Sequence, residues 1–247
     1  MEELVKIICP SSKRADNVMT AKVVHELAIC VPESEAAEYK AHNPNCEIIT
    51  HPNDVIGLPL KRQWIYEKFG NIFMLDDDIA YMRDWTCPPG KNSTFEPDVV
   101  REMIQRQAWM AKEIGAYLFG FNHLVRPVFV HPQQPFAIKG FIPGHSMGLL
   151  KGSKLYWHKR ATTVCDYWIS SLNAYHHRIV WKDLHYGFLQ TKTFKGAGGQ
   201  AQHRSMAVEF EANVFLREYF GSDVIRNKKD TITKRSHDAM RHMALPY

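Results

Sequence analysis

The sequence has few of the features that mark a secreted, disulfide-bonded or membrane-spanning protein. Its five cysteines are scattered, odd in number and free of any Cys-x-x-Cys pair, which argues against a disulfide framework and against a cysteine zinc site. No apolar run approaches the roughly 20 residues of a membrane helix. The N-terminus lacks the basic segment and the long apolar stretch of a signal peptide. A reducing cytoplasm is therefore the expected location.

The composition is that of a globular protein whose charge is unevenly placed. Of its 247 residues, 45% are hydrophobic and 23% are charged, which argues against disorder and allows a real core. Residues 1–138 carry 14 Lys and Arg against 18 Asp and Glu, whereas residues 139–204 carry 10 against 2, a net charge of +8. Such an excess of base in the middle of the chain indicates an anionic partner.

The first 75 residues alternate between strand and helix patterns. Short apolar runs predict four buried strands, over residues 5–9, 27–31, 47–50 and 72–75. Helices are predicted over residues 33–42 and 58–69, the second with Pro59 in its first turn and Gly70 just past its end. This alternation predicts a parallel, Rossmann-like α/β sheet.

The later chain is less regular, and its elements are predicted from separate local patterns. The predicted helices cover residues 97–115, 164–177 and 206–220. The predicted strands cover residues 117–121, 136–142 and 179–181. Residues 186–205, rich in Gly, Thr, Lys and Gln, are predicted to form a loop. No repeat, low-complexity tract or linker divides the sequence, so one domain over residues 1–247 is expected.

Three consecutive carboxylates, Asp76, Asp77 and Asp78, directly follow the fourth predicted strand. Ligands of open α/β sheets bind beyond the carboxyl ends of the strands. Adjacent carboxylates repel one another unless a cation neutralises them. Asp76 and Asp78 point to the same side of an extended backbone, which suits Mn²⁺ or Mg²⁺ bridging to phosphate oxygens. The alternative is a solvated acidic turn that caps the next segment.

The position of this triplet, at the end of a strand in a nucleotide-binding α/β half, resembles the Asp-x-Asp motif of GT-A glycosyltransferases. The loop after the first strand, residues 9–16 (CPSSKRAD), resembles the Pro-Ser-x-x-Arg loop that holds the nucleoside diphosphate in that class. Residues 58–63 (LPLKRQ) lie where the class carries a basic residue near the donor. Residues 165–167 (CDY), opening a helix before a strand, are similar to the unit that supplies the catalytic base in inverting members.

More narrowly, the sequence resembles the TET-associated glycosyltransferases of bacteriophages, which act on hydroxymethylated pyrimidines in DNA. The resemblance lies in residues 29–35 (ICVPESE), 57–65 (GLPLKRQWI), 196–200 (GAGGQ) and the acidic triplet. It implies a GT-A fold, with a Rossmann-like nucleotide-binding half, a mixed central sheet and an adjoining acceptor half. The implied bounds are residues 1–85 for the first half, 86–205 for the acceptor half and 206–247 for a C-terminal helix and basic tail. A phage origin would place the protein in the host cytoplasm.

The resemblance also implies roles for individual residues. Asp76 and Asp78 would hold Mn²⁺ or Mg²⁺, with His203 as a third ligand and His237 as its rival. Asp166 would be the general base that deprotonates an acceptor hydroxyl; a retaining enzyme would need no such base. The donor, a UDP-sugar or another nucleotide-sugar, would contact the residues of the matching motifs, namely Pro10, Ser11, Ser12, Arg14, Arg62, Asp76 and Asp77.

Each of these assignments has a structural alternative. Asp166 also fits a helix N-terminal acid favoured by the helix dipole, and Asp183 competes with it as the base. The basic residues of the matching motifs also fit a solvated surface, because exposed Lys and Arg are common. The sequence has 13 histidines, and any given one is more often a surface or core residue than a metal ligand. Residues 144–148 (GHSMG) line the donor and acceptor cleft in the class, or else form a turn. The tryptophans near the basic stretch would stack on bases or sugars, or pack in the core; they are Trp157, Trp168 and Trp181.

Three functions compete for these features. The first is a metal-dependent glycosyltransferase acting on a hydroxyl acceptor, either 5-hydroxymethylpyrimidine in phage DNA or a non-DNA acceptor; a base inside duplex DNA would have to be flipped out. The second is an Asp-x-Asp phosphohydrolase, which needs acids after the first strand, where residues 9–12 (CPSS) have none. The third is a non-catalytic nucleic-acid-binding protein, which leaves the acidic triplet unexplained. The sugar, the stereochemistry and the oligomeric state stay open.

Overall fold

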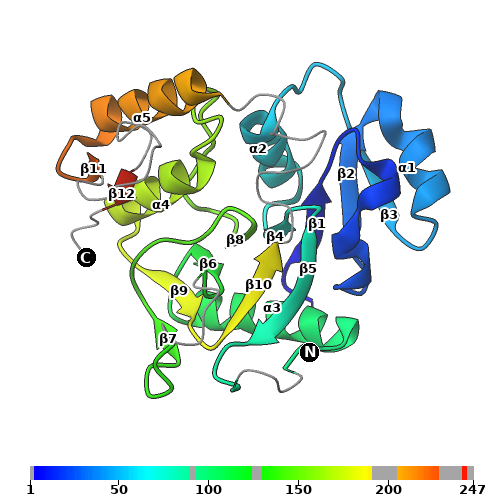
Figure 1. Cartoon of the computed structure of the whole chain (residues 1–247), viewed down its shortest axis with the longest axis horizontal. Coiled ribbons are helices and arrows are strands. Elements are labelled where there is room, and N and C mark those ends of the chain that lie inside the picture. Colours follow the sequence, from blue (N-terminus) through cyan, green and yellow to red (C-terminus); the bar gives the residue numbers. More distant parts are fainter. Residues whose placement is uncertain (1–2, 89–92, 124–129, 191–204, 228–240, 244–247) are drawn as a thin grey trace.

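The computed structural model describes residues 3–88, 93–123, 130–190, 205–227 and 241–243. The described residues build an eight-stranded mixed sheet with the order β3-β2-β1-β4-β8-β6-β9-β7. Helices lie on both faces of this sheet, and a separate two-stranded ribbon crosses one face (Figure 1). No helix among the described residues is long and apolar enough to cross a membrane.

Four parallel strands form the first half of the sheet. They are connected by helices α1 (Ala36–His42) and α2 (Leu58–Phe69) and by short 3-10 helices. The three inner strands are buried along nearly their whole length because both faces of the sheet are covered, whereas the edge strand is partly exposed. The bounds of the strands are β1 (Lys6–Pro10), β2 (Ala28–Pro32), β3 (Glu47–His51) and β4 (Ile72–Leu75). The prediction of a parallel, Rossmann-like first half is therefore confirmed.

The second half mixes strand directions. β8 (Ser146–Leu149) runs antiparallel to both β4 and β6 (Leu118–Gly120) and so joins the two halves in one sheet. Beyond β6 lie β9 (Val180–Asp183), parallel to β6, and the edge strand β7 (Phe136–Ala137). The helices of this half are α3 (Pro97–Glu113), α4 (Cys165–His176) and α5 (Met206–Phe220). A separate hairpin pairs β11 (Ile225–Asn227) with β12 (Arg241–Met243).

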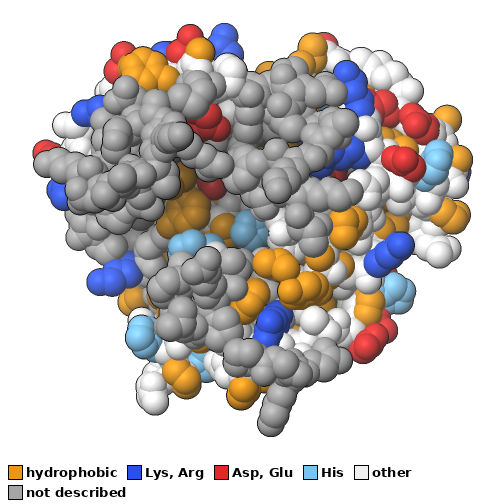
Figure 2. All heavy atoms as spheres, viewed as in Figure 1, with side chains coloured by type: hydrophobic (Ala, Val, Ile, Leu, Met, Phe, Trp, Pro, Cys, Tyr) orange, Lys and Arg blue, Asp and Glu red, His pale blue; other side chains and the backbone are white. Residues whose placement is uncertain are grey.

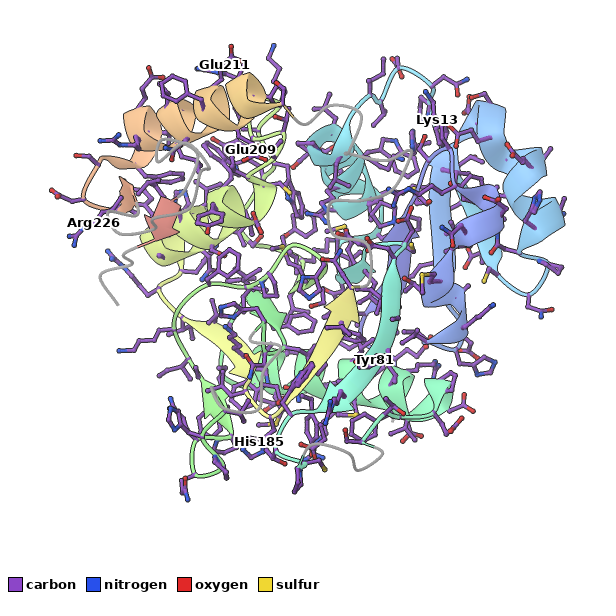
Figure 3. The ribbon with its side chains drawn as sticks, in the orientation of Figure 1. Lys13, Tyr81, His185, Glu209, Glu211 and Arg226 are labelled. Atoms are coloured by element: carbon purple, nitrogen blue, oxygen red, sulfur yellow. The ribbon has the colours of Figure 1, made fainter. Side chains whose placement is uncertain are left out.

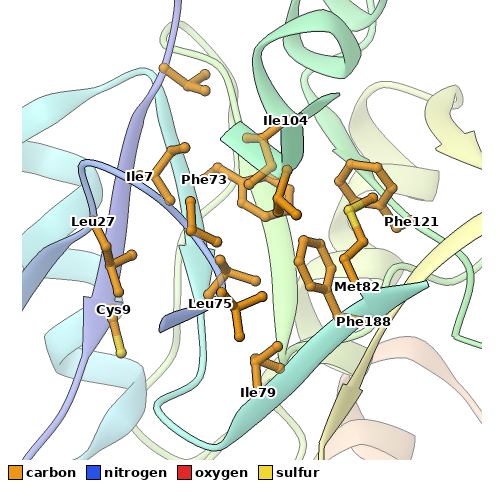
Figure 4. Close-up of a cluster of buried hydrophobic side chains, with 14 of the residues drawn as sticks. Ile7, Cys9, Leu27, Phe73, Leu75, Ile79, Met82, Ile104, Phe121 and Phe188 are labelled. Carbon is orange, nitrogen blue, oxygen red and sulfur yellow. The ribbon is translucent and has the colours of Figure 1, made fainter. Parts of the chain in front are cut away.

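Two hydrophobic clusters lie on opposite faces of the sheet. Because side chains alternate along a strand, Ile7 and Cys9 join one cluster and Ile8 joins the other. The first cluster includes the apolar side of α3 and a group of packed phenylalanines around Phe73 (Figure 4). The second cluster is covered by residues of α2, α4 and α5. The sheet is therefore the middle layer of three.

The predicted loop over residues 186–205 is wrong in its first part. Tyr186–Gln190 forms β10, which pairs antiparallel with β5 (Ile79–Asp84), another strand that was not predicted. The partner strand lies about 100 residues away in the sequence, so a local pattern could not show the pairing. Phe188 is fully buried in the first cluster, and its burial accounts for the strand in spite of polar neighbours. Residues 191–204 lie outside the described part.

The predicted strand over residues 136–142 is also wrong beyond Ala137. Residues 138–145 form bends and a turn, and β8 begins at Ser146, inside the segment 144–148 whose structural alternative was a turn. Within β8, a Cβ atom added at Gly148 would lie 2.1 Å from the ring of Phe119. Close packing of β8 against β6 therefore requires glycine here, and glycine weakens the strand signal in the sequence.

Candidate functional site

The acidic triplet forms a tight connection between β4 and β5, and its backbone is held by two distant segments. Asp76 N donates to the carbonyl oxygen of His145 over 3.0 Å. The hydroxyl of Thr20 donates to the Asp76 carbonyl over 2.5 Å and accepts from Ile79 N over 3.2 Å. The positions of the three carboxylates are therefore determined by contacts from both halves of the sheet.

The three carboxylates point in two directions. Gln190 Nε2 donates to Asp76 Oδ2 over 3.1 Å and to Asp78 Oδ1 over 2.8 Å. Asp77 turns the other way and is 7% exposed. The expectation that Asp76 and Asp78 share one side of the chain is confirmed.

Asp77 joins the triplet to the loop after β1. Its Oδ2 accepts from Ser11 Oγ over 2.6 Å, and its Oδ1 accepts from Arg14 Nη1 over 2.7 Å. The Ser11 hydroxyl also contacts the hydroxyl of Tyr39 on α1 at 2.8 Å. These bonds hold two of the predicted donor-binding residues next to the proposed cation site.

The rest of the β1 loop is bonded to the 3-10 helix (Glu33–Glu35) that follows β2. Ser12 Oγ donates to Glu35 Oε1 over 2.7 Å, and Lys13 N donates to Glu35 Oε2 over 2.8 Å. Figure 3 shows Lys13 near the ends of the first parallel strands, far from His185 at the other end of the molecule. Pro10, the first residue of the matching motif, ends β1 and is buried. The predicted nucleoside loop thus lies at the carboxyl edge of the sheet, where ligands of such sheets bind.

Two basic side chains of α2 are buried at this site. Lys61 is 7% exposed, and its Nζ donates to the Ser11 carbonyl over 2.7 Å. Burial lowers the pKa of this ammonium. Arg62 is 1% exposed; its Nη2 donates to Asp76 Oδ1 over 2.8 Å and to the Gly144 carbonyl over 2.6 Å. Its Nη1 donates to Cys165 Sγ over 2.9 Å, so Arg62 connects the triplet with α4.

The electrostatics of the triplet favour a positive charge. Burial raises the pKa of Asp76, although Arg62 opposes this rise. Burial raises the pKa of Asp78, and the neighbouring charge of Asp76 raises it further. A bound cation would relieve both effects, because it stabilises the ionised carboxylates.

Asp166 lies in the first turn of α4, within the field of this cluster. It is half-buried, and its Oδ1 accepts from Tyr167 N over 2.9 Å. Its charge acts on Asp76 and on Arg62. A Cβ atom at Gly144 would lie 3.1 Å from Asp166 Cβ and 3.1 Å from Arg62 Nη1. The backbone at Gly144 therefore packs closely against both of these side chains. Asp166 lies near the triplet although about 90 residues separate them in the sequence.

The competing acid, Asp183, has a structural role. It is 8% exposed, and its carboxylate accepts from Gln107 Nε2 and from the backbone N atoms of His185 and Tyr186, each over 2.9 Å. These bonds hold the turn between β9 and β10. The interpretation of Asp183 as a turn residue fits this geometry.

Two further residues of the site come from the second half of the sheet. His145 lies in the segment 144–148, which the family resemblance places at the cleft, whereas Gln190 lies in the stretch predicted as a loop. His145 Nε2 is buried and has no hydrogen-bond partner among the described residues. Burial lowers the pKa of His145 to about 4, while Asp166 and Asp78 act in the opposite direction. Gln190 ends β10, in a stretch whose alternation of Tyr186 and Phe188 was the available signal of a strand. Both residues join the triplet through the tertiary structure.

Other predicted residues lie elsewhere. The three tryptophans are in the core, with Trp157 at 3%, Trp168 at 0% and Trp181 at 8% exposure, so they do not offer open stacking faces. His203 and His237 lie outside the described residues, as does most of the basic tail.

Asp76 and Asp78 fit a hard divalent cation in the chemistry of their donors. Their oxygens converge on one nitrogen atom, and carboxylate oxygens are the ligands that Mg²⁺ and Mn²⁺ prefer. Within the described ranges, no three His, Cys, Asp or Glu side chains form a complete metal site. Phosphate oxygens and water commonly complete the coordination of Mg²⁺, and the predicted third ligand, His203, lies outside the described ranges.

Comparison with known proteins defines the class. The sequence profile of the TET-associated glycosyltransferases matches residues 5–199, a segment that contains the β1 loop, the acidic triplet and α4. The match assigns the chain to the glycosyltransferases. The chain belongs to the TET-associated glycosyltransferase family, as the sequence motifs predicted. No curated protein matches the sequence.

Solved structures are similar at low sequence identity. TarS 1–349 of S. aureus aligns with a TM-score of 0.48 and 10% identity, over 85% of this chain and 64% of that chain. The same fragment in complex with UDP gives 0.45 and 9%, with the same coverage. The inositol-1-phosphate CTP transferase from T. maritima gives 0.32 and 9%, over 86% and 97%. The chain thus spans less than two thirds of the length of the TarS fragment.

Proposed function

We propose that the protein transfers a sugar from a UDP-sugar to a hydroxyl acceptor with the help of Mn²⁺ or Mg²⁺. One observation carries the proposal: Asp76 and Asp78 converge on a single point while Asp77 binds the β1 loop through Ser11 and Arg14. These contacts support a cation site that lies next to the loop proposed to bind the nucleoside diphosphate. The UDP complex of TarS supports UDP as the first donor to test.

Each part of the site would contribute to one step. The β1 loop and the neighbouring Lys61 of α2 would orient the nucleoside diphosphate. The side chains of Arg14 and Lys61 would supply positive charge. The cation bound to Asp76 and Asp78 would neutralise the leaving diphosphate. Asp166 would accept the proton of the acceptor hydroxyl as its oxygen bonds to the anomeric carbon and the bond to the diphosphate breaks. This role of Asp166 applies if the reaction inverts the anomeric configuration.

We further propose 5-hydroxymethylpyrimidine in phage DNA as the acceptor. The family assignment and the net charge of +8 over residues 139–204 support a polyanionic acceptor. On the face shown in Figure 2, acidic and basic side chains of the described residues are interspersed along the edge. A hydroxyl acceptor other than DNA is the alternative.

Calorimetry with UDP and Mn²⁺ tests the donor site. We expect UDP to bind more tightly with Mn²⁺ than without it, and Asp78→Ala to abolish this difference because it removes one of two cation ligands. Gln133→Ala, at an exposed position in a turn, is the control. UDP binding that is unchanged by Mn²⁺ and by Asp78→Ala would favour a non-catalytic binding protein.

A radiolabelled transfer assay tests the acceptor. Several UDP-sugars are offered with hydroxymethylcytosine DNA, in Mn²⁺ and with folded protein. Transfer that weakens with added salt is expected, because phosphate contacts are screened. Absence of transfer from every donor would sink the DNA proposal without affecting the donor site.

A further inference from the structure

The amide of Gln190 occupies the place between the two proposed cation ligands. One nitrogen atom donates to Asp78 over 2.8 Å and to Asp76 over 3.1 Å. An amide NH₂ group has two hydrogens, so each carboxylate receives one of them. The contact is possible because β10 pairs with β5, which places Gln190 opposite Ile79, the residue after the triplet.

This arrangement resembles cation binding in its charge pattern. Two neighbouring carboxylates repel each other, and a shared donor with partial positive charge reduces that repulsion. A divalent cation bound to both carboxylates would lie about 2.0–2.2 Å from their oxygens. A nitrogen atom within about 3 Å of the same two oxygens overlaps that position. The amide nitrogen and the cation therefore exclude each other.

We infer that Gln190 is an internal placeholder for the cation, which keeps Asp76 and Asp78 together in the metal-free protein and is displaced when the cation binds. The inference rests on the proposed function, since it takes these two residues as cation ligands. It assigns Gln190 a positioning role: its two hydrogen bonds to charged acceptors must break before the cation enters. Gln190 thereby weakens cation binding and sets its threshold.

The inference also links the cation to the end of β10. The pairing register with β5 shifts between Leu189 and Gln190, so the last residue of the strand departs from the regular ladder. The side-chain bonds of Gln190 hold this strand end against the triplet. Cation binding releases them, so occupancy of the site changes the contacts at this strand end.

Titration with Mn²⁺, following free Mn²⁺ by electron paramagnetic resonance with and without UDP, tests the placeholder. Gln190→Ala is expected to bind Mn²⁺ about three- to tenfold more tightly than the unchanged protein, because no donor has to be displaced. Gln190→Asn, one methylene shorter, cannot reach both carboxylates and is expected to shift affinity in the same direction. Gln190→Lys places an ammonium between them and is expected to abolish binding.

The controls separate this inference from the proposed function. Gln133→Ala is expected to leave Mn²⁺ affinity unchanged, and thermal melting identifies which variants are folded. If the Mn²⁺ affinity is unchanged or weaker in both Gln190→Ala and Gln190→Asn, the placeholder role of Gln190 is overturned. A weaker Mn²⁺ affinity would instead indicate that the Gln190 carbonyl is a ligand. Such a result leaves Mn²⁺ binding at Asp76 and Asp78 intact. Absence of Mn²⁺ binding in the unchanged protein and in Gln190→Ala, with UDP present, would overturn both.

Discussion

The two halves of the central sheet differ in how their residues reach the site. In the parallel half, the β1 loop and the triplet directly follow their strands and α2 follows β3 after a short loop, so the order of strands and helices brings them to one edge. In the mixed half, Gly144, Asp166 and Gln190 approach the triplet from a loop, a helix start and a ribbon. The first half uses the standard geometry of its fold, whereas the second depends on specific close contacts. Substitutions made separately in each half of the sheet test this difference.

The largest effect is expected from the proposed base in the mixed half. Asp166→Asn removes the proton acceptor while keeping the size of the side chain, so kcat should fall about 10²- to 10⁴-fold if the reaction inverts. UDP affinity should stay within about twofold, because the donor residues lie in the parallel half. Steady-state kinetics and calorimetry measure the two quantities. A retained kcat would indicate a retaining mechanism or another base.

The next effect concerns the side chain that joins the halves. Arg62→Met should lower the free energy of unfolding by about 3 kcal/mol, because Asp76 Oδ1 and the Gly144 carbonyl lose the buried cationic donor that they share. Arg160→Met is the matched control; that arginine is 56% exposed and pairs with Glu218 at 3.8 Å, so a change under about 0.5 kcal/mol is expected. Urea denaturation followed by circular dichroism compares them. Equal effects would contradict the assigned role of Arg62.

The junction of β8 with its neighbours gives a third test. Gly148→Ala should destabilise the protein by about 2 kcal/mol, because the new methyl group meets the ring of Phe119 at 2.1 Å. Phe119→Leu in the same chain should recover part of the loss by making room. Additive losses in the double variant, measured by the same denaturation, would show that the two positions do not interact.

The smallest effect is expected at a buried lysine of β9. Lys182 Nζ contacts His123 Nδ1 at 2.8 Å, and burial lowers its pKa to about 8 from 10.5. The unfolded chain then binds more protons than the folded protein between about pH 8 and pH 10.5, so the free energy of unfolding rises with pH in this window. Lys182→Met should remove this rise, which amounts to about 1–2 kcal/mol between pH 8 and about pH 9.5. An identical pH dependence in both proteins would rule out the buried ammonium as its cause.

The predictability of the elements follows the same division. Leu58–Phe69 and Ile72–Leu75 have the predicted bounds, because Pro59, Gly70 and a continuous apolar run are signals within the segment itself. Tyr186–Gln190 was assigned to a loop, since Gly187 and the following polar residues weaken its alternation. Its pairing with β5 and the burial of Phe188 determine its structure. Long-range pairing thus overrode the local composition.

The site divides in a similar way. The convergence of Asp76 and Asp78 and the proximity of Ser11 and Arg14 to the triplet followed from strand ends and from the family resemblance. The bonds of Gln190 had no signal of their own in the sequence, and the family resemblance indicated the segment 144–148 but not the buried Nε2 of His145. They depend on side chains from separate segments meeting in one volume.

The sequence by itself determined the class of the protein, the parallel half of its sheet and the acidic triplet at the carboxyl edge. These features depend on local periodicity, on turn residues and on motifs whose members are close in the chain. Only the tertiary structure decided that Asp166 lies near the triplet while Asp183 holds a turn. It also decided that the amide of Gln190 lies between the carboxylates of Asp76 and Asp78. The physical reason is that burial and hydrogen bonding at the site are set by packing between segments about 65 to 110 residues apart.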